Sequence, residues 1–292
     1  MRVRAVPKEK IRTIRDEDWI DRSRSPYAEG ETIWVPVKDD AAFDRVIPEK
    51  RQYRGRGFFM IGEIAVVHGK KPAHSEVETI VQFRHPQGVL WIESLNDVTR
   101  TPSTEVMWGE AGEVRHHENG YTYFLDPRRV MFSQGNRIEK LRMAALVQES
   151  GLRERVADMF SGIGYFTLPV AGSGGNVHAM EINPVAFDYL QRNIIANGLS
   201  DRITPSLGDC RDLLSGIYNR IIMGHFDAIS LLPSALQHAV AGSTIHVHSI
   251  GSVEDQIREL CKSAGFSPTI MVHKVKKYRP HAWHVVQDVL LA

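Results

Sequence analysis

The strongest constraint on the fold is an alternation of short apolar segments and helical segments that begins near residue 130. Apolar residues with helical spacing cover 137–146. Strands are then expected at 156–160, 177–181, 203–207, 220–224 and 244–248, with helices from about Tyr165, Asn183-Pro184, Ser234 and Val253. This alternation is typical of a parallel sheet with helices on both faces, and runs at 269–275 and 283–290 predict a closing antiparallel hairpin. We therefore expect an α/β domain over residues 131–292.

The first half of the chain has a different pattern. Residues 56–130 contain short strand-like runs separated by glycine-containing turns and predict a small sheet-rich α+β domain. The runs are at 58–61, 63–67, 77–83, 89–92, 104–108 and 121–125. Residues 1–55 are polar and basic, and we expect a lead-in with one short helix and one strand.

Composition excludes several classes of protein. The 292 residues are 42% hydrophobic, which is enough for a large core. The two cysteines form no CxxC pair, so neither a disulfide framework nor a cysteine-based zinc site is expected. The charged N-terminal segment and the absence of apolar runs of about 18 residues predict a soluble cytoplasmic protein. The net charge is only +1, but basic residues cluster, which keeps a nucleic-acid partner open.

A glycine-containing loop follows the first strand of the predicted sheet. Asp158 ends that strand, and Ser161-Gly162-Ile163-Gly164 follows it. A dinucleotide fingerprint would place a third glycine where Thr167 stands, so the loop does not match a pyrophosphate site. An acidic residue at the strand end suits the amino group of an amino-acid ligand.

Acidic residues also end the next two strands. Glu181 is placed to accept hydrogen bonds from two ribose hydroxyls, and Asp209 to accept the amino group of adenine. The alternative is that these acids only cap helices or solvate loops. Three acids at successive strand ends, beside a glycine loop, favour a nucleoside-binding edge.

Three segments carry a resemblance to a known family: DMFSGIGYFTLP, AMEINPVAFDYLQRNIIANGL and KKYRPHAWHVVQDVL. They resemble class I S-adenosylmethionine enzymes that modify the purine beside the tRNA anticodon, over roughly residues 60–292. The resemblance implies a class I methyltransferase-like Rossmann sheet, S-adenosylmethionine as cofactor and tRNA, at position 37, as partner. It also implies chemistry without a metal, and we expect a monomer with no membrane partner.

The family has two branches, and two segments favour one of them. Its guanine-37 N1-methyltransferases share an Asn-Leu-Pro type motif after the fourth strand, where this chain has Met223-Gly224-His225. Phe132-Ser133-Gln134-Gly135-Asn136 is similar to the wybutosine-pathway aminocarboxypropyltransferases. By that match Ser133 and Lys140 contact the cofactor, and Lys140 suits its methionine carboxylate. The full expected cofactor set is Ser133, Lys140, Asp158, Phe160, Gly162, Glu181, Ile182, Asp209 and Cys210.

The resemblance therefore implies transfer of the 3-amino-3-carboxypropyl group to carbon 7 of 4-demethylwyosine in phenylalanine tRNA. The alternatives are guanine-37 N1-methylation and a tRNA-binding protein without catalysis. His225 is a candidate general base, with a structural or base-stacking role as the alternative. Candidate substrate-binding residues, which a plain solvated surface would also explain, are Arg51, Arg54, Arg56, Met223, Gly224, His225, Lys276 and Lys277. Histidine pairs such as His246 and His248 lack suitably spaced acid or cysteine partners, so no metal site is expected.

Overall fold

The computed structural model describes residues 1–14, 16–47, 53–151 and 153–292. The chain divides into two compact units, Met1–Arg54 and Gly55–Ala292. The second unit contains both segments that were predicted as separate domains, 56–130 and 131–292. These segments share one hydrophobic core, in which Ile61 and Leu90 of the first pack with Val156 and Leu168 of the second.

The first unit is a four-stranded sheet in the order β2-β3-β1-β4. The buried residues of its strands include Val3 and Val6 of β1 and Val35 of β3. A compact sheet therefore stands where the sequence led us to expect a basic lead-in with one helix and one strand. Its elements are β1 (Arg2–Pro7), the 3-10 helix η1 (Lys8–Lys10), β2 (Tyr27–Glu29), β3 (Thr32–Pro36) and β4 (Arg45–Val46).

The second unit begins with a four-stranded sheet, in the order β5-β6-β7-β8, and a separate hairpin of β9 and β10. The prediction of a strand at 77–83 is wrong, because these residues lie in helix α1. Val77 and Ile80, three residues apart, form its buried face, and Glu76 accepts a hydrogen bond from the backbone of Ala73 at its start. The elements are β5 (Phe59–Ile61), β6 (Ile64–His68), α1 (His74–Arg84), β7 (Gly88–Asn96), β8 (Thr101–Gly109), β9 (Val114–Glu118) and β10 (Tyr121–Leu125).

The rest of the unit is built on a seven-stranded sheet in the order β13-β12-β11-β14-β15-β17-β16. The first five strands are parallel, and β17 runs antiparallel to both β15 and β16, which confirms the closing hairpin. The strand order reverses between β11 and β14, the kind of switch point where ligands bind in such sheets. The strands are β11 (Arg155–Asp158), β12 (Asn176–Glu181), β13 (Ile203–Leu207), β14 (Arg220–Met223), β15 (Thr244–Ile250), β16 (Pro268–Arg279) and β17 (Ala282–Leu291).

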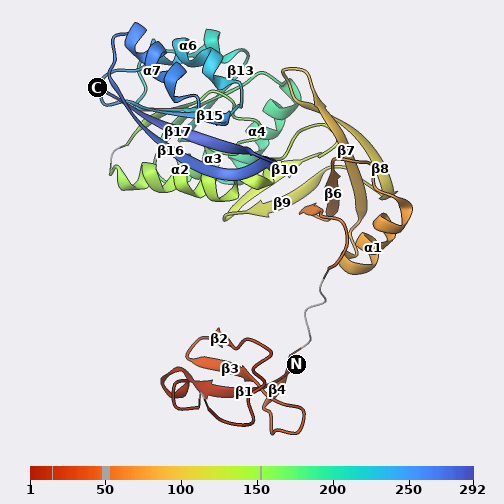
Figure 1. Cartoon of the computed structure of the whole chain (residues 1–292). Coiled ribbons are helices and arrows are strands. Elements are labelled where there is room, and N and C mark those ends of the chain that lie inside the picture. Colours follow the sequence, from red (N-terminus) through yellow and green to blue (C-terminus); the bar gives the residue numbers. More distant parts are fainter. Residues whose placement is uncertain (15, 48–52, 152) are drawn as a thin grey trace. The chain divides into compact units, whose positions relative to one another are not determined.

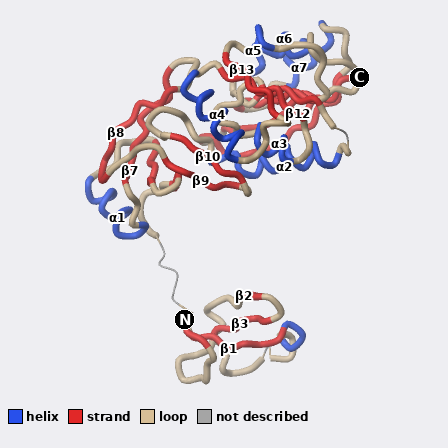
Figure 2. The backbone as a smooth tube through the Cα atoms, turned by 180° about the vertical axis from the view of Figure 1, so that it is seen from behind, coloured by secondary structure: helices blue, strands red, loops and turns tan. Residues whose placement is uncertain are grey.

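Helices cover both faces of this sheet (Figure 1). One hydrophobic cluster includes Met143, Leu168 and Leu190 from α2, α3 and α4, and a second includes Leu232 and Ile257 from α6 and α7. Figure 2 shows the hairpin of β9 and β10 beside α4. The helical elements are η2 (Gln134–Asn136), α2 (Arg137–Glu149), α3 (Thr167–Gly172), α4 (Pro184–Ala196), α5 (Cys210–Leu213), η3 (Ala228–Leu231), α6 (Leu232–Leu236) and α7 (Glu254–Ser263).

Candidate active site

The loop after β11 is held in shape by buried hydrogen bonds. Asp158 is fully buried, and its carboxylate accepts the hydroxyl of Thr167 at 2.7 Å and the backbone N–H of Phe160 at 3.3 Å. Burial raises the pKa of Asp158 to about 6, although the Thr167 hydroxyl opposes the shift. Gly162 has a φ of +55°, and a side chain there would collide with the ring of Tyr165, so only glycine fits.

Glu181, at the end of β12, binds the same loop. Its carboxylate accepts the backbone N–H of Gly162 and that of Asn183, each at 2.7 Å. Burial raises its pKa, and the backbone donors oppose that shift. The side chain of Asn183 caps α4 as the sequence predicted, because it accepts from Val185 at 2.9 Å. Asp158, Gly162 and Glu181 thus form one connected edge of the sheet.

The third predicted acidic residue, Asp209, binds an arginine side chain. Asp209 caps α5, and the guanidinium of Arg211 binds both of its carboxylate oxygens, which lowers its pKa. Cys210 is buried, and burial raises its pKa to about 11, so the thiol is neutral and is not an activated nucleophile. Ile182 is 42% exposed beside Glu181, where it offers an apolar surface to a ligand.

Ser133 lies directly before η2, and Lys140 lies one turn into α2. Lys140 is fully buried, and its ammonium donates to Glu118 of β9 at 2.7 Å. Its Nζ lies 4.7 Å from the ring centroid of Phe132 and 5.2 Å from that of Tyr165. Burial lowers the pKa of Lys140, and Glu118 opposes the shift. The lysine that the sequence assigned to the cofactor carboxylate therefore already has an internal carboxylate partner.

A second lysine lies near the same segment. Lys276 of β16 packs its side chain over Gly135, where an added Cβ would lie 2.3 Å from the lysine Nζ. Burial lowers the pKa of Lys276, and within the described chain it forms no ion pair with an acidic side chain. The side-chain oxygen of Asn136, also buried, has no hydrogen-bond partner among the described residues. A lysine without an acidic partner and an amide oxygen without a hydrogen-bond partner therefore lie at the segment 133–136.

Aromatic rings form the wall beyond β14. Met223 is buried at the end of the strand, and Gly224 approaches the ring of Phe166. His225 stacks on Phe160 with ring centroids 5.4 Å apart. One nitrogen of His225 receives the backbone N–H of Asp227 at 3.2 Å, and the other faces a guanidinium. Burial lowers the pKa of His225. These contacts fit a stacking residue better than a general base.

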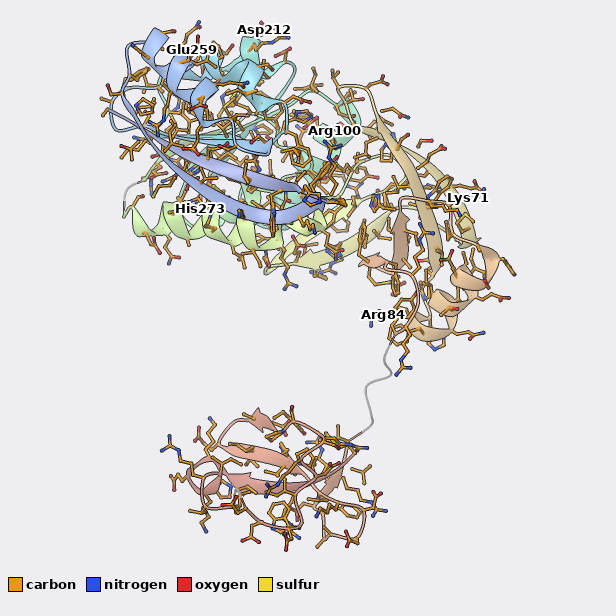
Figure 3. The ribbon with its side chains drawn as sticks, viewed as in Figure 1. Lys71, Arg84, Arg100, Asp212, Glu259 and His273 are labelled. Atoms are coloured by element: carbon orange, nitrogen blue, oxygen red, sulfur yellow. The ribbon has the colours of Figure 1, made fainter. Side chains whose placement is uncertain are left out.

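The guanidinium belongs to Arg100, which the sequence did not single out. Arg100 lies between β7 and β8, and its Nη1 is 3.3 Å from Nε2 of His225, 125 residues away. The side chain of Asn183 donates to the carbonyl of Thr99 at 3.1 Å. Figure 3 shows Arg100 where this hairpin meets the seven-stranded sheet. No sequence signal marks it, because its place depends on how the small sheet packs against the large one.

The basic residues predicted to bind the substrate differ in their contacts and exposure. Arg56 is held within its own domain, where it donates to the carbonyl of His68 at 3.0 Å and pairs with Glu76 at 3.5 Å. Arg54 and Lys277 are exposed, and Arg51 lies outside the described residues. Within the described chain no group of three or more histidine, cysteine or acidic side chains is arranged to hold a metal. No described helix has the length and apolar character of a membrane span.

Comparison with known proteins identifies the family. The model of the TRM5/TYW2 methyltransferase domain matches residues 114–266. The chain is 33% identical over 241 residues to a Methanocaldococcus jannaschii protein named tRNA(Phe) (4-demethylwyosine(37)-C(7)) aminocarboxypropyltransferase, covering 78% of this chain and 95% of that protein.

Solved structures from both branches are similar. Trm5b from Pyrococcus abyssi is 26% identical with a TM-score of 0.76, covering 99% of each chain. TYW2 from Pyrococcus horikoshii, in complex with MeSAdo, is 28% identical with a TM-score of 0.70, covering 82% of this chain and 92% of that one. The fold alone therefore does not choose between the branches.

Proposed function

Because the chain belongs to the TRM5/TYW2 methyltransferase family, we propose that it transfers the 3-amino-3-carboxypropyl group of S-adenosylmethionine to C7 of 4-demethylwyosine. The acceptor base is at position 37 of phenylalanine tRNA, and methylthioadenosine is released. The observation that carries this choice is the wall after β14. Gly224 and the His225–Phe160 stack stand there, in place of the polar motif that the N1-methyltransferases share.

The residues at the sheet edge fit the cofactor. We propose that Glu181 binds the ribose hydroxyls, that Ile182 and Cys210 lie beside the adenine, and that Asp209 accepts its amino group. Asp158 and the loop to Gly162 are proposed to hold the methionine amino group. Ser133 and Lys140 are proposed to contact the carboxylate. Lys140 would then share its charge between that carboxylate and Glu118, which already binds it at 2.7 Å.

S-adenosylmethionine supplies a sulfonium that activates three attached carbons, so the residues around it decide which carbon meets the acceptor. Alignment of the acceptor in line with the departing sulfur provides most of the rate enhancement. We propose that the segment 133–136 and the loop 158–164 fix the methionine part with its γ-carbon toward the wall after β14. His225 and Phe160 then offer a stacking surface to the tricyclic base.

For the partner, we propose that the anticodon region of tRNA lies over this edge. Arg54, Lys276 and Lys277 are candidates for phosphate contacts, together with Arg51, whereas Arg56 supports the fold of its own domain. A monomer acting in the cytoplasm is part of the same proposal. Sedimentation with and without tRNA, and cell fractionation, test these two points.

The released thioether tests the proposed reaction. Purified enzyme is incubated with S-adenosylmethionine and tRNA carrying either 4-demethylwyosine or guanosine at position 37, and the nucleoside products are separated by chromatography. We expect methylthioadenosine, only with the 4-demethylwyosine tRNA. Release of S-adenosylhomocysteine with the guanosine tRNA would contradict the proposal.

A second candidate function is guanine-37 N1-methylation. It is favoured by one observation, the similarity to Trm5b over 99% of both chains. The same chromatogram distinguishes it. A tRNA-binding protein without catalysis would give neither thioether, and calorimetry would then find no binding of S-adenosylmethionine.

A further inference from the structure

The turn between β7 and β8 is bound by a side chain from the seven-stranded half of the second unit. Residues 97–100 form this turn, and the carbonyl of Thr99 accepts a hydrogen bond from the side-chain amide of Asn183 at 3.1 Å. Asn183 lies at the start of α4, 84 residues further along the chain. The bond therefore joins the small sheet to the element that follows Glu181.

Asn183 uses its polar groups for three different purposes. Its backbone N–H donates to the carboxylate of Glu181 at 2.7 Å. Its side-chain oxygen accepts the backbone N–H groups of Val185 and Ala186 at 2.9 and 3.4 Å, which caps α4. Its side-chain nitrogen donates to Thr99. The oxygen alone makes the cap, so the bond from the amide nitrogen to the turn is a separate contact.

The backbone of the turn adopts a conformation that needs support. Asp97 and Arg100 have φ values of +58° and +50°, in the left-handed region that residues other than glycine seldom adopt. The backbone N–H of Arg100 donates to the carbonyl of Asp97 at 3.1 Å, which closes the turn. Such conformations persist where the surrounding structure holds them. The bond from Asn183 reaches Thr99, the residue directly before Arg100, and supplies such a hold.

The side chain of Arg100 leads from the turn to the wall after β14. Its Nη1 lies 3.3 Å from Nε2 of His225. The ring of His225 stacks on that of Phe160, with 5.4 Å between centroids, and the backbone N–H of Phe160 donates to Asp158. The turn is therefore connected, through Arg100 and His225, to the loop that follows β11.

These contacts close into a ring. One carboxylate oxygen of Glu181 accepts the N–H of Asn183 and the other accepts the N–H of Gly162, each at 2.7 Å. Gly162 lies two residues after Phe160 in the same loop. The contacts thus run from this loop through Glu181 and Asn183 to the turn, and return through His225. The bond from Asn183 to the turn is the link that a substitution removes while the helix cap is kept.

We propose that Asn183 is a positioning residue for the acceptor base, an inference that rests on the proposed function. Its amide nitrogen fixes the carbonyl of Thr99, and this places Arg100 and His225 at the surface on which the base stacks. Asn183 acts through the turn, without contact to the base. A displacement of about 1 Å is enough to misalign two reacting groups and to slow their reaction by up to about 100-fold. Cofactor binding at the strand ends does not need this link.

The test compares transfer rates in single turnovers at saturating tRNA and cofactor. Asn183→Ser keeps an oxygen that caps α4, because serine caps helices about as well as asparagine, and it removes the amide donor. We expect the transfer rate to fall about 10-fold, the order of one lost hydrogen bond, while calorimetry gives an unchanged Kd for S-adenosylmethionine. Asn183→Asp also keeps the cap but turns an acceptor toward the carbonyl of Thr99, so its rate should fall at least as far.

The matched control is Asn197→Ser, at the other end of α4. The amide nitrogen of Asn197 donates to the carbonyl of Thr122 at 2.7 Å, and its oxygen accepts the N–H of Thr122 at 2.9 Å. It therefore binds the backbone of a neighbouring hairpin, as Asn183 does, but that hairpin does not carry Arg100. Asn197→Ser should transfer at the wild-type rate. A rate loss confined to the Asn183 variants is then not an effect of a loosened helix.

A double variant tests the route through Arg100. Arg100→Gln should slow the transfer by itself. If Asn183 acts by placing Arg100, the addition of Asn183→Ser to Arg100→Gln slows the transfer no further, whereas independent effects multiply. Multiplied effects, a wild-type rate in Asn183→Ser, or an equal loss of S-adenosylmethionine affinity in that variant would each overturn the proposal.

The proposed function is checked first and separately. Wild-type enzyme should transfer the carboxyl label of the cofactor to tRNA carrying 4-demethylwyosine. If it transferred methyl label instead, the proposed function would fail. The rates of the same variants in that methyl transfer would still decide whether Asn183 positions the base.

Discussion

The carboxyl edge of the seven-stranded sheet has two halves with opposite chemistry. In the acidic half, at the ends of β11 and β12, the carboxylates of Asp158, which is buried, and Glu181, which is partly buried, accept hydrogen bonds from backbone groups and a hydroxyl. In the histidine half, at the end of β15 and the start of β17, His248 and His284 are buried and keep unpaired nitrogens. We propose that the acidic half binds polar groups of the nucleoside. In the histidine half, Nδ1 of His248 lies 2.9 Å from Nε2 of His284, and the other nitrogen of each ring has no partner among the described residues. The two halves thus differ in whether their buried polar atoms have partners within the described chain.

The buried ion pair of Lys140 and Glu118 gives the largest expected effect. Lys140→Met leaves the carboxylate of Glu118 buried without its partner, and we expect a loss of about 3–5 kcal/mol in unfolding free energy. The double variant with Glu118→Leu should recover most of that stability. Denaturant unfolding of the three proteins measures both effects.

The double variant also tests the proposed cofactor role of Lys140. If Lys140 contacts the methionine carboxylate, the stable double variant binds S-adenosylmethionine more weakly than the wild type in calorimetry. Unchanged affinity would mean that another cation binds the carboxylate, and Lys276, which packs over Gly135, is a candidate.

The next largest effect is expected from removing the carboxylate of Glu181. Glu181→Ala should weaken S-adenosylmethionine binding by about 1–3 kcal/mol, the usual cost of leaving buried polar groups unpaired. Glu113→Ala is the matched control, because Glu113 pairs with Arg192 at 2.7 Å on the surface near α4. Equal affinities of the two variants would mean that the ribose is not bound at Glu181.

The two halves should also respond to pH with opposite signs. The pKa of His284 is lowered to about 4 in the folded protein, so the unfolded chain takes up its proton first as pH falls through about 6.5. Wild-type protein should therefore lose stability between pH 6.5 and 5, relative to His284→Gln, by on the order of 1 kcal/mol. Thermal melts of both proteins across that range measure the difference.

Asp158 should show the opposite dependence of stability on pH. Its pKa is raised to about 6 in the folded protein, so its stabilising contribution is present at low pH and is lost as pH rises through 6. Relative to Asp158→Asn, wild-type protein should lose stability as pH rises from about 4 to about 6, with little further change above that. Parallel slopes for the Asp158 and His284 comparisons would contradict the division of the edge into two halves.

The sequence predicted the acidic half well because its signals are local. Strand ends, the glycine loop and the Asn183 cap each depend on residues that are close in the chain, and the structure has them as expected. Local signals failed at 77–83, where strand-favouring residue types outweighed the helical spacing of Val77 and Ile80. In residues 1–54 the sheet was missed because its strands have no two-residue alternation, and the buried residues of β1, Val3 and Val6, are three apart.

The histidine half could not be predicted because its contacts join distant residues. His248 and His284 are 36 residues apart, and they meet only through the register of β15 with β17. The contact of Arg100 with His225 spans 125 residues and depends on packing between two sheets. The partner of Lys140 was missed for the same reason, since Glu118 comes from the hairpin of β9 and β10. Alternating histidines on one strand did appear in the sequence, but only their partners show what they do.

The most direct test of the proposed reaction follows the labelled carbon. S-adenosylmethionine labelled either in its methyl group or in its carboxyl group is incubated with the enzyme and tRNA carrying 4-demethylwyosine, and the label in purified tRNA is counted. We predict carboxyl label in the tRNA and none from the methyl group. Methyl label in the tRNA without carboxyl label would contradict transfer of the aminocarboxypropyl group and would assign the chain to the methyltransferase branch.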